Sequence, residues 1–133
     1  MDTVPATLRG ARWALVAQGW LYVVTGLWPV AHLSSFERVT GEKYDDFLVH
    51  TVGLLLFVIG AGLLRALRAR QPPVEIVLVA SGSALALALI DVVYVANGRL
   101  SPIYLLDAGA ELVFVLAGVA VLRARARDRG ADD

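Results

Sequence analysis

The stretch VEIVLVASGSALALALIDVVYVA (residues 74–96), NGRLS (97–101) and PIYLLDAGAELVFVLAGVAVL (102–122) contains two apolar segments separated by a polar connection. A helix rises about 1.5 Å per residue, so about 20 mainly apolar residues span the hydrocarbon of a bilayer. The Asn-Gly and Ser-Pro pairs between the segments favour a tight reversal. The stretch therefore predicts two consecutive membrane-spanning helices.

Two further apolar segments lie upstream, at residues 13–33 and 47–64, and Pro72-Pro73 separates the second span from the third. A chain that is 58% hydrophobic and only 18% charged is too apolar for a soluble domain of this size. Arg9 and Arg12 precede the first segment, but its length favours a retained span over a cleaved signal peptide. We expect an all-α, polytopic four-helix bundle that forms a single transmembrane domain over residues 1–133.

The basic residues are distributed unequally between the two sides of these spans. Lys and Arg near span ends stay cytoplasmic, and nine of the 12 would lie on one side. We therefore predict a multi-pass protein of the cell inner (plasma) membrane, with both termini cytoplasmic and the 34–46 loop outside. Residues 123–133 are expected to form a charged, frayed tail. This placement uses the basic residues for topology and leaves no basic face for nucleic acid.

The outer loop carries signals for helix ends. Ser34 followed three residues later by Glu37 fits a capping box, and Asp45 or Asp46 can cap the second span. We therefore expect helix caps and an interfacial helical turn in this loop.

Three acids, Asp91, Asp107 and Glu111, lie inside apolar segments that contain no Lys or Arg. An ionised carboxylate in hydrocarbon costs at least about 2.5 to 3.5 kcal/mol, so such groups face a protein interior, a wet cavity or a partner. Asp107 and Glu111 lie one helical turn apart and repel each other when both are ionised. We expect these acids to be protonated, paired with His or bound to a cation.

Other polar and small residues follow helical spacing. Gln18, Tyr22 and Thr25 share one face of the first span, and His50 lies near the outer end of the second. Asp91 continues a stripe of small residues that should face another helix. This stripe consists of Ala80, Ala84 and Ala88, and the glycines expected at close helix contacts are Gly53, Gly60, Gly62, Gly109 and Gly118.

These faces predict that all four helices direct a polar group to one cavity in the outer half of the bundle. Glu111 falls near the bilayer centre, and Asp91 and Asp107 lie roughly 6 to 9 Å further out. The residues predicted to bind a ligand are Gln18, Tyr22, Thr25, His50, Asp91, Tyr94, Asp107 and Glu111.

Several segments resemble a known group of proteins. Thr-Gly-Leu-Trp-Pro at residues 25–29, Thr-Gly-Glu-Lys at 40–43 and the run from Phe47 to Leu56 are similar to small bacterial four-helix membrane proteins of the broadly DoxX-like group. The resemblance implies a compact four-helix bundle. It carries over no activity and no catalytic residue.

The sequence limits the chemistry that the bundle can perform. The absence of cysteine excludes disulfides, thiolate metal sites and iron–sulfur clusters. His50 and the three acids are ligand types that suit zinc, manganese or iron, but no HExxH or Glu-x-x-His spacing supports a metal site. We therefore expect neither a metal nor a cofactor.

Three functions stay open at this point. The first is binding or movement of a proton-linked, cationic or amphipathic small ligand in the acid-lined cavity; movement through so narrow a bundle would require a homodimer. The second is a membrane-embedded isomerase, cyclase or hydrolase, with Asp91, Asp107 and Glu111 as catalytic general acid and base. The third is a subunit of a larger membrane complex in which a partner supplies a basic residue for the acids.

Overall fold

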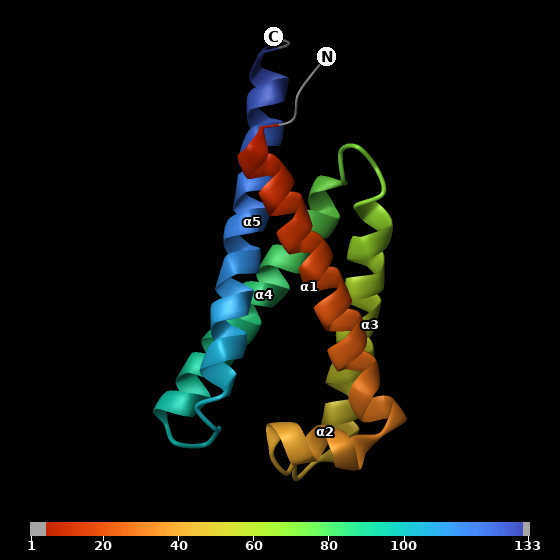
Figure 1. Cartoon of the computed structure of the whole chain (residues 1–133), viewed down its shortest axis with the longest axis vertical. Helices are drawn as coiled ribbons and strands as arrows, with labels where there is room; N and C mark the ends of the chain where they lie inside the picture. Colours follow the sequence, from red (N-terminus) through yellow and green to blue (C-terminus); the bar gives the residue numbers. More distant parts are fainter. Residues whose placement is uncertain (1–4, 132–133) are drawn as a thin grey trace.

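The computed structural model describes residues 5–131, and every regular element in that range is a helix. The elements are α1 (Ala6–Ala31), α2 (Leu33–Thr40), α3 (Asp46–Ala66), α4 (Val74–Ala96) and α5 (Tyr104–Ala131) (Figure 1). Helices α1, α3, α4 and α5 are long and apolar enough to cross a membrane. The four predicted spans are confirmed as helices, and α2 occupies the predicted outer loop.

The observed helix ends confirm some predicted signals and correct others. Asp45 caps α3 by accepting a hydrogen bond from the backbone N–H of Leu48 at 3.1 Å, as predicted. The prediction that Ser34 and Glu37 form a capping box is wrong. His32 precedes α2 instead and its Nδ1 accepts from the backbone N–H of Ser35, because the chain turns sharply after α1 and places the imidazole at the first turn of α2.

The last helix is longer than the hydrophobic pattern indicates. Helix α5 continues past residue 122 to Ala131, so the expected frayed tail is helical over residues 123–131. Residues 132–133 of that tail, and residues 1–4 of the predicted domain, lie outside the described range. Arg and Ala are strong helix formers, so the alternating Arg-Ala sequence extends the helix after its apolar segment ends.

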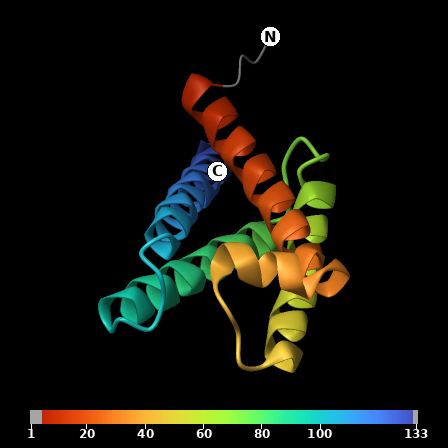
Figure 2. The ribbon, with the colours of Figure 1, turned by 60° about the horizontal axis from the view of Figure 1, so that its bottom comes forward.

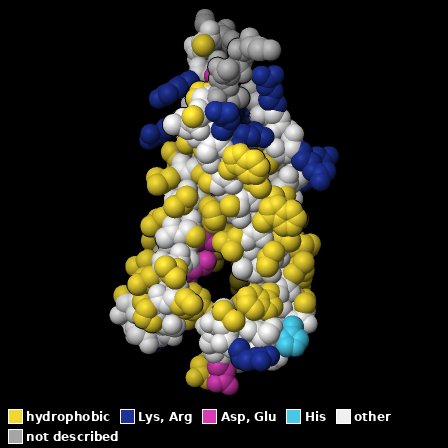
Figure 3. Space-filling view, in the orientation of Figure 1, with side chains coloured by type: hydrophobic (Ala, Val, Ile, Leu, Met, Phe, Trp, Pro, Cys, Tyr) yellow, Lys and Arg dark blue, Asp and Glu magenta, His cyan; other side chains and the backbone are white. Residues whose placement is uncertain are grey.

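The four long helices form two pairs that diverge. Helix α1 packs along α3, and α4 packs along α5, while α1 also contacts α5. The pairs approach each other at the end where α1 begins and α5 ends, which we call the arginine-rich end (Figures 1 and 3). At the opposite end, called the α2 end, the pairs separate and α2 lies across the space between them (Figures 1 and 2).

Glycines determine how closely α1 and α3 approach. A Cβ atom added to Gly53 would lie 2.6 Å from the carbonyl oxygen of Gly26, and one added to Gly60 would lie 2.6 Å from that of Gly19. These distances are shorter than side chains tolerate, so backbone meets backbone at two levels of this helix pair. The prediction of close packing is confirmed for Gly53 and Gly60.

The other three glycines predicted at close helix contacts differ in how near the neighbouring helix lies. A Cβ at Gly118 would collide with Ser81 of α4, which confirms close packing between α4 and α5. A Cβ at Gly62 would make an ordinary contact with Ile76, and one at Gly109 would meet nothing within 4 Å. The prediction for Gly109 is wrong because that side of α5 faces away from the other helices.

The small-residue stripe of α4 faces the interior, as predicted. Ala80, Ala84, Ala88 and Asp91 are all buried. Helix α5 packs along α4, and the Gln18 side chain of α1 reaches the stripe by donating from Nε2 to the carbonyl oxygen of Ala80 at 2.8 Å. Small residues let helices approach in lipid, where the attraction comes from close contact and interhelical hydrogen bonds.

The outer surface of the long helices is apolar. Large hydrophobic side chains, including Trp20, Val58, Leu106 and Leu116, are more than half exposed on α1, α3 and α5. Yellow side chains cover the visible flanks in Figure 3, and Lys and Arg side chains gather at the arginine-rich end. This distribution fits a multi-pass membrane protein, since lipid tails can cover such flanks.

Candidate functional site

Three helices bring five polar side chains together between the two helix pairs. Helix α1 contributes Gln18 and Tyr22, α4 contributes Asp91, and α5 contributes Asp107 and Glu111. We call these five residues the acidic site. Gln18, Tyr22, Asp91 and Glu111 are buried, and Asp107 is half-buried. The site therefore joins the two helix pairs through polar groups inside an otherwise apolar bundle.

Tyr22 and Glu111 form the direct link between α1 and α5. The Tyr22 hydroxyl donates to Oε2 of Glu111 at 2.7 Å, and each residue is 1% exposed. This distance is in the ordinary range for an O–H···O hydrogen bond. This contact orients the Glu111 carboxyl group and leaves its Oε1 for another partner.

Asp91 of α4 and Asp107 of α5 face each other. Their carboxyl groups lie close enough to interact directly, and the charge of Asp107 also acts on Glu111. Oδ2 of Asp91 is buried and has no hydrogen-bond partner within the described part of the chain. Two carboxylates in contact repel each other, so this pair requires a shared proton or a bound cation.

Gln18 marks the inner end of the polar cluster. Its amide lies beside the Tyr22 hydroxyl, and its buried Oε1 has no partner among residues 5–131. Beyond it, towards the arginine-rich end, Leu15, Leu63 and Ala117 belong to one buried apolar cluster. The polar cluster therefore ends at Gln18, and apolar side chains fill the bundle between Gln18 and the arginine-rich end.

The hydrogen bonds that basic side chains donate in the described part of the chain end on groups outside the acidic site. Arg12 donates to carbonyl oxygens after α3, and Arg125 donates to that of Pro72. Lys43 donates to the carbonyl of Thr40 and to the Tyr104 hydroxyl, at 3.1 and 2.9 Å. Over residues 5–131, none of these hydrogen bonds ends on an acid of the acidic site.

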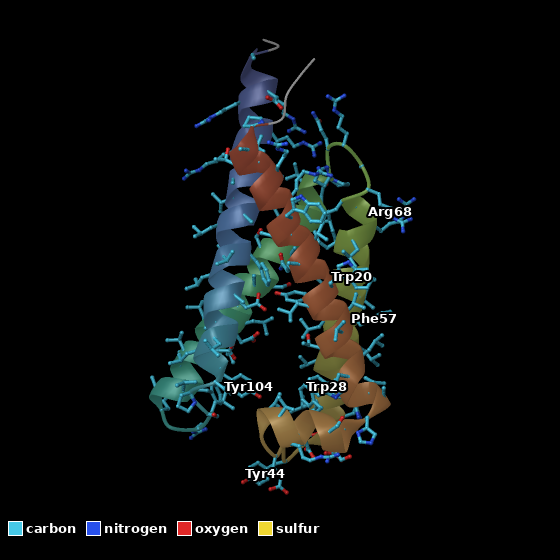
Figure 4. All side chains as sticks on the ribbon, in the orientation of Figure 1. Trp20, Trp28, Tyr44, Phe57, Arg68 and Tyr104 are labelled. Atoms are coloured by element: carbon cyan, nitrogen blue, oxygen red, sulfur yellow. The ribbon has the colours of Figure 1, made fainter. Side chains whose placement is uncertain are left out.

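An opening lies between the two helix pairs on the side of the acidic site nearer α2. Figure 3 shows this opening, with Asp or Glu side chains at its margin. Tyr104 extends from α5 towards α2 (Figure 4), and its hydroxyl donates to the carbonyl of Thr40 at 3.1 Å. The ring of Tyr104 also lies 5.2 Å from the Lys43 ammonium. These contacts connect α2 to α5 and border the opening at the α2 end.

Three predicted site residues lie outside this cluster. Nε2 of His50 hydrogen-bonds to the carbonyl of Pro29 at 3.1 Å; because a carbonyl only accepts, His50 donates to the last turn of α1. Thr25 donates to the carbonyl of Leu21 in its own helix, and Tyr94 is 40% exposed. The expectation that all four spans supply the site is wrong, because α3 packs behind α1 through glycines.

Among residues 5–131, no group of three His, Asp or Glu side chains is arranged to hold a metal ion. His50 cannot join the three acids in a metal site, because its side chain contacts Pro29 in the last turn of α1.

Two pockets are distinct from the acidic site. One of about 280 Å³ lies between α1, α2 and α3 beside Pro29, Phe36 and Val52. The other, of about 250 Å³, lies between α4 and α5 at the arginine-rich end. Neither pocket is lined by an acid of the site, so the acid-lined cavity expected from the sequence stays a prediction.

Comparison with known proteins finds no matching family model, no matching curated protein and no matching solved structure. The resemblance to the DoxX-like group stays a prediction. The chemistry of the acidic site therefore carries the functional argument.

Asp91→Asn is expected to stabilise the protein by about 1 kcal/mol, because an amide can donate to Asp107 where a second carboxylate repels it. Thermal unfolding in detergent measures this, with the exposed Asp46→Asn as a control. Asp46 lies in the first turn of α3, where a negative charge favours the helix. Loss of this charge should therefore destabilise the protein slightly. A large destabilisation by Asp91→Asn would show that the carboxyl pair holds the bundle together.

Proposed function

We propose that this protein is a multi-pass membrane protein whose acidic site binds a small lipophilic cation. The observation that carries the proposal is the cluster of buried Asp91, half-buried Asp107 and buried Glu111, which lacks a basic partner within the described residues. Natural bundles retain intramembrane acids where they contact a substrate, an ion or a proton. A cation supplies the missing countercharge.

The shape of the site favours a ligand that enters from the α2 end. The opening between the helix pairs borders the acids (Figure 3), while apolar side chains close the bundle beyond Gln18. A ligand with aromatic or aliphatic groups around its charge can contact the apolar walls while its charge meets the carboxyl groups. Nine of the 12 basic residues lie at the other end, so we place that end in the cytoplasm and the opening outside the inner membrane.

Cation binding is expected to release protons. Three neighbouring carboxyl groups without a countercharge cannot all be ionised, so a bound cation replaces about one proton. We expect this release when tetraphenylphosphonium is added to the weakly buffered protein in detergent, measured with a pH indicator dye. Triphenylphosphine oxide, which is aromatic but uncharged, serves as the control and should release none. Cation binding without proton release would contradict the proposed proton linkage.

The hydrogen bond between Tyr22 and Glu111 favours a second candidate function, which is catalysis on a lipophilic substrate. A buried tyrosine–carboxyl pair can transfer a proton to a bound lipophilic substrate, as the predicted isomerase, cyclase or hydrolase requires. Mass spectrometry of compounds extracted with the protein, before and after incubation with membrane lipids, separates the two functions. A cation recovered unchanged supports binding, whereas a product that disappears in Glu111→Gln supports catalysis.

A further inference from the structure

A second candidate site lies at the arginine-rich end, away from the acidic site. The groove between the start of α4 and the last part of α5 has a volume of about 250 Å³. We call it the basic groove. Its lining residues are Val74, Leu78, Leu122, Arg125, Ala126 and Arg129.

The groove combines an apolar floor with two positive charges. Leu122, Arg125 and Arg129 follow helical spacing on one side of α5, and Val74 and Leu78 lie one turn apart on α4. Arg125 is half-buried and donates to the carbonyl of Pro72, which holds its side chain beside the groove. The guanidinium group has further N–H donors for an anion.

The groove also lies where the apolar segments end. The apolar run of α4 begins at Val74, and that of α5 ends at Leu122, immediately before the alternating Arg-Ala sequence. The groove therefore crosses the boundary between hydrocarbon and headgroups. A ligand that fits it carries an anionic group joined directly to hydrocarbon.

We propose that the basic groove binds one anionic glycerophospholipid. Its phosphate contacts Arg125 and Arg129, and an acyl chain covers Val74, Leu78 and Leu122. Basic pockets between membrane helices on the cytoplasmic side bind anionic headgroups in this way. Charge complementarity and the apolar floor together favour a lipid over a free phosphate ion, which would leave the floor uncovered. This site is independent of cation binding at the acidic site.

Native mass spectrometry of the detergent-solubilised full chain tests the proposal. The probe is an equimolar mixture of phosphatidylglycerol and phosphatidylcholine with identical acyl chains. We expect one phosphatidylglycerol to be retained preferentially, and Arg129→Gln to reduce its retention about fivefold. Arg127→Gln is the matched control, because Arg127 lies on the opposite side of α5, carries the same charge and does not line the groove.

Three results would overturn the proposal. Equal losses in Arg129→Gln and Arg127→Gln would show that only the overall charge of α5 matters. Equal retention of the two lipids would show that the arginines do not select the headgroup. Displacement of phosphatidylglycerol by inorganic phosphate would identify a phosphate site without a role for the acyl chain. Because both variants change exposed residues, folding is expected to be unaffected and is checked by circular dichroism.

Discussion

Asp107→Asn combined with Glu111→Gln is expected to weaken tetraphenylphosphonium binding at least about 100-fold. Loss of one partner of a buried charge pair costs about 2 to 5 kcal/mol, and each tenfold in affinity corresponds to about 1.4 kcal/mol. The double substitution removes two of the three carboxyl groups that would face the cation. Equilibrium dialysis of the detergent-solubilised protein measures the dissociation constant.

The double variant is expected to stay folded. Gln at position 111 still offers an oxygen to the Tyr22 hydroxyl, which donates to Glu111 in the native protein. The matched control is Glu42→Gln combined with Asp46→Asn, which changes two exposed acids at the α2 end by the same atoms and charges. Equal binding by the native protein and the acidic-site variant would refute the proposed cation site. Equal weakening by both variants would indicate a general surface effect.

The helical periodicity of the sequence identified most of the acidic site. The sequence placed Asp91 on the alanine stripe of α4, and Gln18 and Tyr22 on one face of α1. All three residues are buried where α1, α4 and α5 meet. Such spacing works because a buried helix face repeats every three to four residues. The burial of polar residues within apolar segments therefore followed from the sequence.

The identity of each helix neighbour did not follow from the sequence. His50 was predicted to face the acids, but α3 packs behind α1 through Gly26 and Gly53 and directs His50 to Pro29. Periodicity shows which residues share a face, whereas the neighbour depends on the long-range contacts between helices. The link between Lys43 and Tyr104 was missed for the same reason, since the two residues lie far apart in the sequence.

Gly26→Ala is expected to destabilise the protein by about 3 kcal/mol or more. Its Cβ would collide with the backbone of Gly53 and lie 2.7 Å from the backbone nitrogen of Phe57, so a flexible side chain cannot relieve the overlap. Overpacking typically costs about 1 to 3 kcal/mol, and displacement of a helix backbone belongs at the upper end. Thermal unfolding in detergent, followed by circular dichroism, measures the change in the free energy of unfolding.

The same substitution should also affect the acidic site, because Tyr22 lies one turn before Gly26 on α1. Separation of α1 from α3 changes the tilt of α1 and thereby the contact of Tyr22 with Glu111, so tetraphenylphosphonium binding should weaken as well. Gly82→Ala is the control: a Cβ there meets nothing within 4 Å, and Ala is about 0.5 to 1 kcal/mol more favourable than Gly inside a helix. If Gly26→Ala were as stable as Gly82→Ala, the close backbone contact between α1 and α3 would be refuted. If it lost stability but bound the cation normally, the acidic site would not depend on the tilt of α1.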